Sequence, residues 1–336
     1  FGQHILDSGL FSIKPGLPVL LVNEIGGVRG VSEAHLPFLK KHFNLITMKE
    51  FLENKAYFSE KVKAIYLWYF KPDIDKELLM CLPKLQVIAN AEVGMDHLDL
   101  KLISGFGVRM ASTPDALCSA TAEGGIALLL AAARRLLEGC QIAVSPDTEY
   151  FASNWLGDEV TGATLGIIGM GNIGYRIAQK AKAFEMKILY HNRNRRNWLW
   201  VPPIAASPRE DLLQQSDFVM LVVNLTPQAY KLTGKKELEL MKPTATLINI
   251  SRGPVVEQDM LLKALQTGVI KGAVMDITYP EPLPRDHPLL KLKNVLITPP
   301  LAGRTTRSSF MVMKEAVENI LAALSGLPMP SEVFPD

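Results

Sequence analysis

Cysteine is scarce in this chain. Only three of the 336 residues are cysteines, Cys81, Cys118 and Cys140, and no two of them form a CxxC pair. This spacing suits neither a zinc site nor a disulfide framework, so we predict no metal site. Because so few cysteines are typical of a reducing compartment, we expect the protein to be cytoplasmic.

The chain also lacks long apolar runs and an excess of one charge. Its longest unbroken apolar stretch, 124–133, is shorter than the roughly 18 residues that a membrane-spanning helix needs. Thirty-six Lys and Arg against 34 Asp and Glu leave a net charge of +2, too balanced for a surface that binds nucleic acid or an anionic membrane. Residues 1–16 lack the charged start and apolar block of a signal peptide, although a chain that begins at Phe1 leaves a removed leader open. The expected partners are small molecules or other proteins.

The chain is rich in short aliphatic runs that alternate with helical patterns. At this length, with 48% apolar residues, about two domains with substantial cores are expected. The alternation is typical of α/β units wound around parallel sheets, and it forms two series. The first series predicts strands at 18–23, 44–48, 62–68, 85–90 and 107–111. The second predicts strands at 164–169, 187–190, 217–223, 244–250, 271–277 and 294–298, enough for a full dinucleotide-binding fold.

Two long helices are predicted between and after these series. Residues 123–137 are rich in Ala and Leu, and Gly139 is expected to end that helix. A second helix is expected at about 306–325, ending at Gly326. Its predicted buried stripe consists of Phe310, Met313, Val317, Ile320, Leu321 and Leu324.

A GxGxxG motif opens the second series, with its glycines at 169, 171 and 174. The motif alone is weak evidence, but here an apolar strand precedes it and an amphipathic helix follows. Gly169 allows the tight turn, Gly171 lets the backbone approach a pyrophosphate, and Gly174 lets the helix pack on the strand. The helix N-terminus then presents N–H groups to the phosphates, so the motif predicts dinucleotide binding.

The end of the second strand predicts which dinucleotide binds. The segment 187–196 contains no Asp or Glu that could accept hydrogen bonds from a free ribose 2′-hydroxyl. It carries Arg193, Arg195 and Arg196, which suit a 2′-phosphate. We therefore predict NADP(H) in preference to NAD(H); the alternative is a solvated basic loop.

A second group of charged residues follows later strands. Arg252 lies just beyond a buried strand, at the edge where ligands of this fold bind, and a guanidinium there can clamp a carboxylate and polarise a carbonyl. Asp276 closes the next strand and Glu281 lies in Tyr-Pro-Glu-Pro-Leu-Pro, although either acid could instead cap a turn.

Taken with further motifs, these residues make the sequence similar to the D-2-hydroxyacid dehydrogenase family, in particular its glyoxylate/hydroxypyruvate reductase branch. The resemblance covers nearly the whole chain. Its motifs are Val93-Gly-Met-Asp-His-Leu-Asp, Thr113-Pro-Asp, Ser216-Asp-Phe-Val, Asn224-Leu-Thr-Pro, Met241-Lys-Pro-Thr-Ala, Ile250-Ser-Arg-Gly and Asp286-His-Pro-Leu-Leu.

The resemblance implies two doubly wound parallel-sheet domains, a Rossmann domain inserted in a flavodoxin-like substrate domain. The implied boundaries are 1–115 with 301–336 for the substrate domain and 116–300 for the NAD(P)-binding domain. It also implies a homodimer that pairs through the nucleotide domains.

The site implied by the resemblance holds a small 2-oxo acid that is reduced to a 2-hydroxy acid by hydride transfer from NADPH. Arg252 and backbone N–H groups near Val93 and Gly94 meet the substrate, and Glu281 corresponds to the acid that pairs with a catalytic histidine. The implied cofactor contacts, with the residues predicted above, are Thr121, Gly169, Gly171, Asn172, Ile173, Gly174, Arg193, Arg196, Thr226, Ile250 and Asp276, the last near the nicotinamide carboxamide.

One departure from the family bears on catalysis. The segment after the last strand reads Ile297-Thr-Pro-Pro-Leu-Ala-Gly303, so Pro300 stands where the family carries its proton-donating histidine. No histidine follows His287, and proline has no titratable group. Because general acid catalysis contributes about 10²–10⁴-fold, turnover is predicted to be slow. A second departure is Glu92, where the family more often has a small neutral residue; facing the substrate, it would oppose anion binding.

These features leave two functions open. The first is an impaired NADPH-dependent reductase of glyoxylate or hydroxypyruvate. The second is a catalytically inactive NADP(H)-binding sensor or interaction protein, for which Pro300 is the main support.

Overall fold

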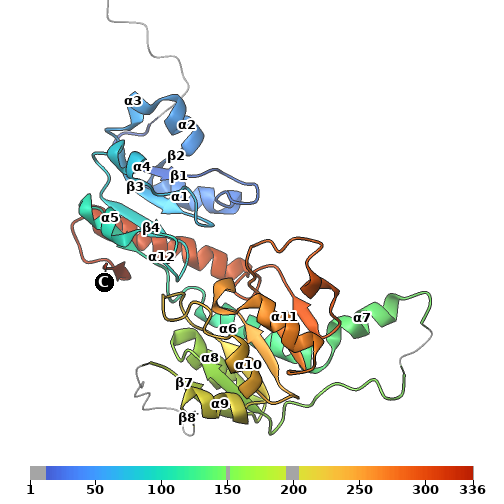
Figure 1. The fold of residues 1–336 in the computed structure, drawn as a ribbon. Helices are drawn as coiled ribbons and strands as arrows, with labels where there is room; N and C mark the ends of the chain where they lie inside the picture. Colours follow the sequence, from blue (N-terminus) through green and yellow to red (C-terminus); the bar gives the residue numbers. More distant parts are fainter. Residues whose placement is uncertain (1–12, 149–151, 194–203, 336) are drawn as a thin grey trace, which may run out of the picture. The chain divides into compact units, whose positions relative to one another are not determined.

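The computed structural model describes residues 13–148, 152–193 and 204–335. Contacts within the chain divide it into two compact units. Unit 1 comprises the residues up to Ala116 and those from Ser309 on, and unit 2 runs from Leu117 to Ser308, eight residues beyond the second boundary implied by the sequence (308 − 300). Figure 1 traces the chain through unit 1, then unit 2, and back to unit 1 with its last helix.

Unit 1 is built on a six-stranded sheet with the order β13-β5-β4-β3-β1-β2. Five of the strands run parallel, and only β13 pairs in the opposite direction, against β5. The strands are β1 (Val19–Val22), β2 (Asn44–Thr47), β3 (Val62–Leu67), β4 (Val87–Asn90), β5 (Arg109–Ala111) and β13 (Glu332–Val333).

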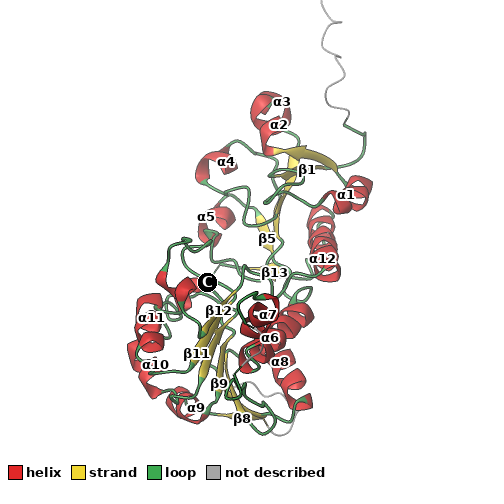
Figure 2. Ribbon diagram, turned by 90° about the vertical axis from the view of Figure 1, so that its right-hand side faces the viewer, coloured by secondary structure: helices red, strands yellow, loops and turns green. Residues whose placement is uncertain are grey.

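Helices cover both faces of this sheet (Figure 2). Side chains from α2 to α5 and alternate strand residues form one core, which includes Phe51, Phe58, Ile65, Ile88 and Ile103. The helices of unit 1 are α1 (Leu36–His42), α2 (Met48–Glu53), α3 (Lys55–Phe58), α4 (Lys76–Met80), α5 (Leu100–Gly105) and α12 (Thr306–Leu324), with a 3₁₀ turn at Glu33–His35; the first residues of α12 belong to unit 2.

Unit 2 is built on a seven-stranded sheet with the order β12-β11-β10-β9-β6-β7-β8. All its neighbouring strands pair in parallel, and the order reverses between β6 and β9, the kind of point at which such folds bind dinucleotides. The strands are β6 (Thr164–Ile168), β7 (Lys187–His191), β8 (Ile204–Ala206), β9 (Phe218–Leu221), β10 (Thr246–Asn249), β11 (Gly272–Met275) and β12 (Val295–Ile297).

The helices of unit 2 form a layer on each face of its sheet (Figure 2). Ile126, Leu129 and Ile177 from α6 and α8 pack on one face, whereas Leu212 and Leu261 from α9 and α11 pack on the other. The helices are α6 (Cys118–Ala133), α7 (Leu136–Val144), α8 (Asn172–Ala183), α9 (Arg209–Gln215), α10 (Lys235–Leu240) and α11 (Gln258–Gln266), with 3₁₀ turns at Gly253–Val255 and Pro288–Lys291.

The predicted fold class, two α/β domains with parallel sheets, is confirmed. All the predicted strands are present, but β8 and β13 were not predicted. Each of these two strands has only two or three residues and lies at a sheet edge, so neither gives a periodic signal.

The predicted helix at 123–137 is wrong at both ends. Helix α6 begins at Cys118, and Arg135 breaks it with φ of 52°, so Gly139 lies inside α7 instead of ending a helix. Arg135 forms a paired contact with the Glu138 carboxylate, at 2.9 and 2.7 Å, and donates to the Leu156 carbonyl at 3.2 Å. These contacts stabilise a break that a run of helix formers does not reveal.

The predicted stripe of α12 is partly wrong. Met313, Val317 and Ile320 are buried, but Phe310 is 41% exposed, and Leu321 and Leu324 are only half-buried. The buried face is completed instead by Val312, Ala316 and Ala323.

Candidate active site

The turn between β6 and α8 is built around the three glycines of the GxGxxG motif. Gly169 has φ of +108°, which favours glycine, and a Cβ there would lie 2.1 Å from the Val222 carbonyl oxygen. A Cβ on Gly174 would lie 2.2 Å from the Gly169 carbonyl oxygen, so the helix packs directly on the end of the strand. A Cβ on Gly171 would meet no heavy atom within 4 Å. The fold of the turn therefore requires Gly169 and Gly174, whereas Gly171 faces open space.

Helix α8 begins at this open space. Gly171 is its N-cap residue and supplies no side-chain cap, while Asn172 is exposed and Ile173 half-buried. The N-terminus of a 12-residue helix carries partial positive charge and N–H groups that suit a phosphate. The residues of this turn fit the pyrophosphate of a dinucleotide.

The end of β7 fixes the other side of the glycine turn. The Asn192 side chain accepts from the Met170 N–H at 2.6 Å and donates to the Met170 carbonyl at 3.2 Å. Gly169 N–H donates to the His191 carbonyl at 3.0 Å. Arg193, the next residue, is exposed. The prediction for Arg196 falls outside the described residues, as does the neighbouring Arg195.

Three other predicted cofactor contacts lie elsewhere in unit 2. Two of them follow strands of its sheet, and the third lies in α6. Ile250 directly follows β10 and is buried, at 7% exposure. Thr226 follows β9, and its hydroxyl accepts from the Ala229 N–H at 3.2 Å. Thr121 lies in the first turn of α6, where its hydroxyl would be 2.9 Å from a Cβ on Gly303.

Arg252 lies on a braced turn after β10. The buried Asn249 amide donates to the Arg252 carbonyl at 2.9 Å and accepts from both the N–H and the hydroxyl of Ser251. A Cβ on Gly253 would lie 2.2 Å from the Thr278 carbonyl oxygen. This close packing sets the turn that carries Arg252 against the segment that follows β11.

Asp276, at the end of β11, is 3% exposed, and the protein itself binds its carboxylate. One oxygen accepts from the Thr298 hydroxyl at 2.8 Å and from the Leu301 N–H at 3.0 Å, and the other accepts from the Ala302 N–H at 3.1 Å. The carboxylate thereby anchors the loop after β12. Its predicted contact with the nicotinamide carboxamide stays a prediction.

Glu281 lies in the exposed loop after Asp276. Protein atoms crowding its carboxyl raise the pKa of Glu281, and the negative charge of Asp276 raises it further. A hydrogen bond from the Thr278 N–H and the charge of Arg252 oppose this rise in pKa without cancelling it. The pKa of Glu281 therefore lies above the ordinary value of a glutamate side chain.

The loop after β12 has no titratable side chain from Thr298 to Gly303. Pro300, at the predicted histidine position, is half-buried. A Cβ on Gly124 of α6 would lie 2.4 Å from the Ala302 Cα, so the helix backbone packs closely on this loop. His287, the last histidine in the sequence, caps the 3₁₀ turn that follows it by accepting from the Leu289 N–H at 3.2 Å.

The predicted substrate contacts Val93 and Gly94 lie in unit 1, in the loop after β4. The Asn90 amide, fully buried, donates to the carbonyls of Glu92 at 3.3 Å and Gly94 at 3.0 Å. Thr113 N–H also donates to the Glu92 carbonyl, at 3.2 Å. The backbone of this loop is therefore fixed, and the Glu92 side chain is half-buried.

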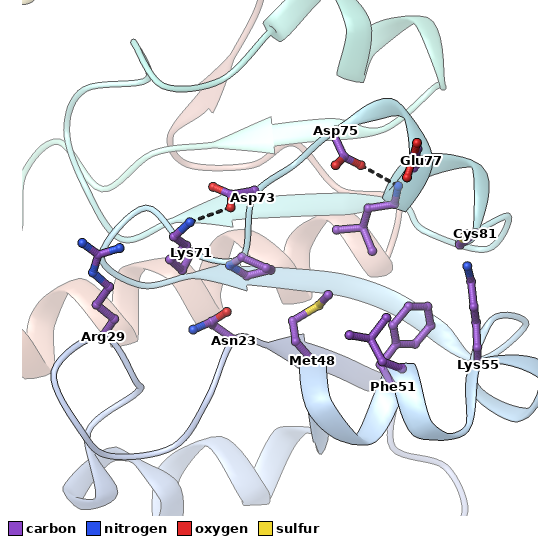
Figure 3. A pocket seen from close by; sticks show the side chains of 13 residues that line it. Asn23, Arg29, Met48, Phe51, Lys55, Lys71, Asp73, Asp75, Glu77 and Cys81 are labelled. Atoms are coloured by element: carbon purple, nitrogen blue, oxygen red, sulfur yellow. Dashed lines mark hydrogen bonds and ion pairs between the residues drawn. The ribbon is translucent and has the colours of Figure 1, made fainter.

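A separate cavity of about 430 Å³ opens in unit 1 between α2 and α4 (Figure 3). None of its lining residues is a predicted site residue. Lys71 pairs with Asp73 at 2.5 Å, and Asp75 accepts from the Leu78 N–H at 2.7 Å. Figure 3 marks these two contacts with dashed lines.

Two absences hold for the described part of the chain. No group of three or more His, Cys, Asp or Glu side chains there is placed to hold a metal ion. None of its helices combines the length and the apolar character that crossing a membrane requires.

Sequence reasoning missed the asparagines that hold the site loops. Asn90, Asn192 and Asn249 each stand at the end of a strand and hydrogen-bond the following turn or a neighbouring one. The signal that could have found them is an amide at the carboxyl end of three apolar strands of parallel sheets.

Comparison with known proteins gives a consistent result. The family model described as "D-isomer specific 2-hydroxyacid dehydrogenase, NAD binding domain" matches residues 126–302, more than half of the chain. A glyoxylate reductase of Korarchaeum cryptofilum is 38% identical over 312 residues, which cover 91% of this chain and 94% of that protein. A glyoxylate reductase of Pyrococcus horikoshii is 40% identical over 266 residues, covering 77% of this chain and 79% of that protein.

Solved structures agree with these relatives. The TT0316 protein from Thermus thermophilus has a TM-score of 0.82 at 34% identity, covering 94% of this chain and 99% of that one. An NADPH-dependent glyoxylate/hydroxypyruvate reductase from Sinorhizobium meliloti, solved with NADP and malonate, has a TM-score of 0.80 at 26% identity and covers 94% of this chain and 96% of its own.

Proposed function

The chain belongs to the D-isomer specific 2-hydroxyacid dehydrogenase family, and from that premise we propose that it reduces glyoxylate or hydroxypyruvate with NADPH. The family makes it an oxidoreductase that binds a nicotinamide dinucleotide. The observation that supports the proposed reaction best is the pairing of the Gly171 turn with Arg252 beyond the carboxyl ends of β6 and β10 of one sheet.

The preference for NADPH is supported by Arg193. It is exposed directly after Asn192, whose side chain ties this strand end to the glycine turn. An amide at that position neither repels a 2′-phosphate nor supplies the carboxylate that a free 2′-hydroxyl needs. A relative solved with NADP shows that the fold accepts this cofactor.

In the proposed reaction the bound NADPH supplies a hydride. Arg252 holds the substrate carboxylate and polarises its carbonyl. Asp276 keeps the loop of Pro300 in place by its three hydrogen bonds. Because the Pro300 side chain has no proton to donate, we expect turnover by this chain to be slow.

The first test is NADPH oxidation with glyoxylate and with hydroxypyruvate, by the chain as it stands and by Pro300→His. We expect weak but measurable kcat in the parent and an increase of about 10²-fold in Pro300→His, since general acid catalysis contributes about 10²–10⁴-fold. Equal and rapid turnover by both would contradict the impairment, and no turnover by either would contradict the reductase function.

A non-catalytic NADP(H)-binding protein is the second candidate. The loop from Thr298 to Gly303 favours it, because this loop has no titratable side chain. Under this alternative NADPH binds, as followed by its fluorescence, but the parent shows no turnover while Pro300→His does. The first experiment therefore separates the two functions.

Two properties belong to the proposal as well. A homodimer is supported by helix α7, which contains no buried residue. Its apolar side chains Leu136, Leu137 and Val144 are all more than half exposed, and a second copy of the chain could cover them. A cytoplasmic location is supported by the low number of cysteines, three in 336 residues.

A further inference from the structure

The loop that carries Pro300 contains no group that can donate the proton the reaction needs. The only side-chain hydroxyl in Thr298–Gly303 is that of Thr298, and it donates to Asp276 at 2.8 Å. The Asp276 carboxylate is also engaged within the protein, since it is buried and accepts three hydrogen bonds from the same loop. These three hydrogen bonds occupy both carboxylate oxygens of Asp276 and direct them toward the loop.

Glu281 is the second of the two acids predicted at this site. It follows Asp276 by five residues, and the packing of Gly253 on the Thr278 carbonyl, 2.2 Å from an added Cβ, brings the turn of Arg252 to the same loop. The charges of Arg252, from the end of β10, and Asp276, from the end of β11, both act on its carboxyl. An exposed acid thus lies within electrostatic reach of the guanidinium assigned to the substrate.

In the family, an acid at this position pairs with the catalytic histidine, and this chain has no histidine there. An acid that orients a histidine does nothing for catalysis when the histidine is absent. Pro300 is half-buried, and its side chain has no group that donates or accepts a hydrogen bond, so it cannot deliver a proton to the substrate. Proton transfer through one intervening water is an accepted route for a general acid.

We propose that Glu281 is itself the proton donor of this enzyme and passes its proton through a water molecule to the carbonyl oxygen of the 2-oxo acid. This inference rests on the proposed function and names the residue behind the turnover that remains. As C2 of the substrate accepts the hydride, the Glu281 O–H bond breaks, a water O–H takes its place, and that water gives a proton to the substrate oxygen. The carboxylate regains a proton from solvent after the product leaves, so one NADPH and one proton are consumed for each hydroxyl formed.

The electrostatics of Glu281 agree with this role. Crowding and the charge of Asp276 raise the pKa of Glu281, and the Thr278 N–H and Arg252 limit the rise. A general acid must hold its proton near the working pH, and a carboxyl with an elevated pKa does so better than an ordinary glutamic acid.

The test is Glu281→Gln in two backgrounds, the parent chain and Pro300→His, with glyoxylate and NADPH. In the parent we expect kcat to fall by at least about tenfold with little change in KM, whereas Glu281→Asp keeps part of the activity. The parent kcat should also fall as pH rises through the elevated pKa of Glu281, and in Pro300→His this limb should move toward the ordinary histidine value of about 6.5. A role limited to orienting a histidine predicts no effect of Glu281→Gln in the parent.

The matched control is Glu159→Gln, at another exposed glutamate of unit 2 that lies outside the predicted site, and it should leave kcat unchanged. Thermal unfolding and NADPH fluorescence should be the same for Glu281→Gln and the parent, because the side chain is exposed and outside the glycine turn. Unchanged parent turnover in Glu281→Gln overturns the inference, and so does loss of turnover in Glu92→Gln instead. If neither the parent nor Pro300→His reduces any 2-oxo acid, the proposed function fails as a whole.

Discussion

Arg193 is the described residue that we predict to favour NADPH over NADH. We expect Arg193→Ala to weaken NADPH binding by about tenfold or more and NADH binding hardly at all, because a charge-assisted hydrogen bond to a 2′-phosphate contributes about 1.5–3 kcal/mol. Fluorescence titration of the purified protein with each dinucleotide measures both constants. Arg285→Ala, at another exposed arginine of unit 2, is the control. Equal weakening of the two dinucleotides refutes the contact.

His35 should make the stability of the protein depend on pH. Its ring is 4% exposed, lies 5.5 Å from the Trp68 ring, and has no hydrogen-bond partner at Nδ1 among the described residues. Burial lowers the pKa of His35 below its ordinary value of 6.5. As pH falls through 6.5, the unfolded chain takes up a proton that the folded chain does not, so stability is lost from there down to the folded pKa.

We therefore expect the Tm to drop between about pH 7 and pH 5, and His35→Phe to remove part of that drop. Thermal denaturation across this range is the measurement, with His42→Gln, at a half-buried histidine of α1, as the control. A pH dependence that is identical in His35→Phe and the parent argues against this role of His35.

Single side chains also mark the limit of prediction from sequence. Glycines 169 and 174 were predicted for the reasons that the structure shows, because their roles depend only on backbone geometry. Asn192 and Asn249 were missed, because whether an amide reaches a neighbouring turn depends on strands that are distant in sequence. The assignments of Arg252, Glu281 and the cofactor contacts stay predictions.

Among the elements, the β6–α8 turn separates a structural glycine from one reserved for a ligand. We expect Gly174→Ala to destabilise unit 2, because its Cβ would meet the Gly169 carbonyl oxygen at 2.2 Å, a clash with backbone. Overpacking of this kind costs about 1–3 kcal/mol. Gly171→Ala should leave the Tm nearly unchanged, since its Cβ meets nothing, but should weaken NADPH binding by filling the space assigned to the pyrophosphate.

Thermal unfolding and NADPH titration of both variants check this pair. The prediction fails if Gly171→Ala binds NADPH like the parent, which would place the pyrophosphate elsewhere. It also fails if Gly174→Ala is as stable as the parent.

The elements themselves differ in how far the sequence predicts them. Buried parallel strands such as β9 are continuous apolar runs, and all of these were found. The break between α6 and α7 was not, because Arg135 adopts a left-handed conformation held by Glu138 and Leu156, and neither contact is visible in local periodicity. Local propensity fails where a tertiary contact decides the backbone.

At the scale of the whole molecule, the proposed dimer depends on α7. Its exposed Leu137 and Val144 are separated by seven residues, so they lie on one face of the helix. We expect Leu137→Glu with Val144→Glu to halve the mass measured by light scattering while leaving the fold intact. Leu52→Glu, at an exposed leucine of α2, is the control. A parent that is monomeric at all concentrations would contradict the dimer.

The anchoring of the loop after β12 by Asp276 has a consequence for the history of the protein. All three hydrogen bonds to its carboxylate come from residues 298, 301 and 302, so the backbone around position 300 is supported whichever amino acid stands there. Two of the four proline codons, CCU and CCC, differ from a histidine codon by one base. A lineage that kept this scaffold after losing the imidazole could regain it through a single point mutation, without having to rebuild the surrounding loop.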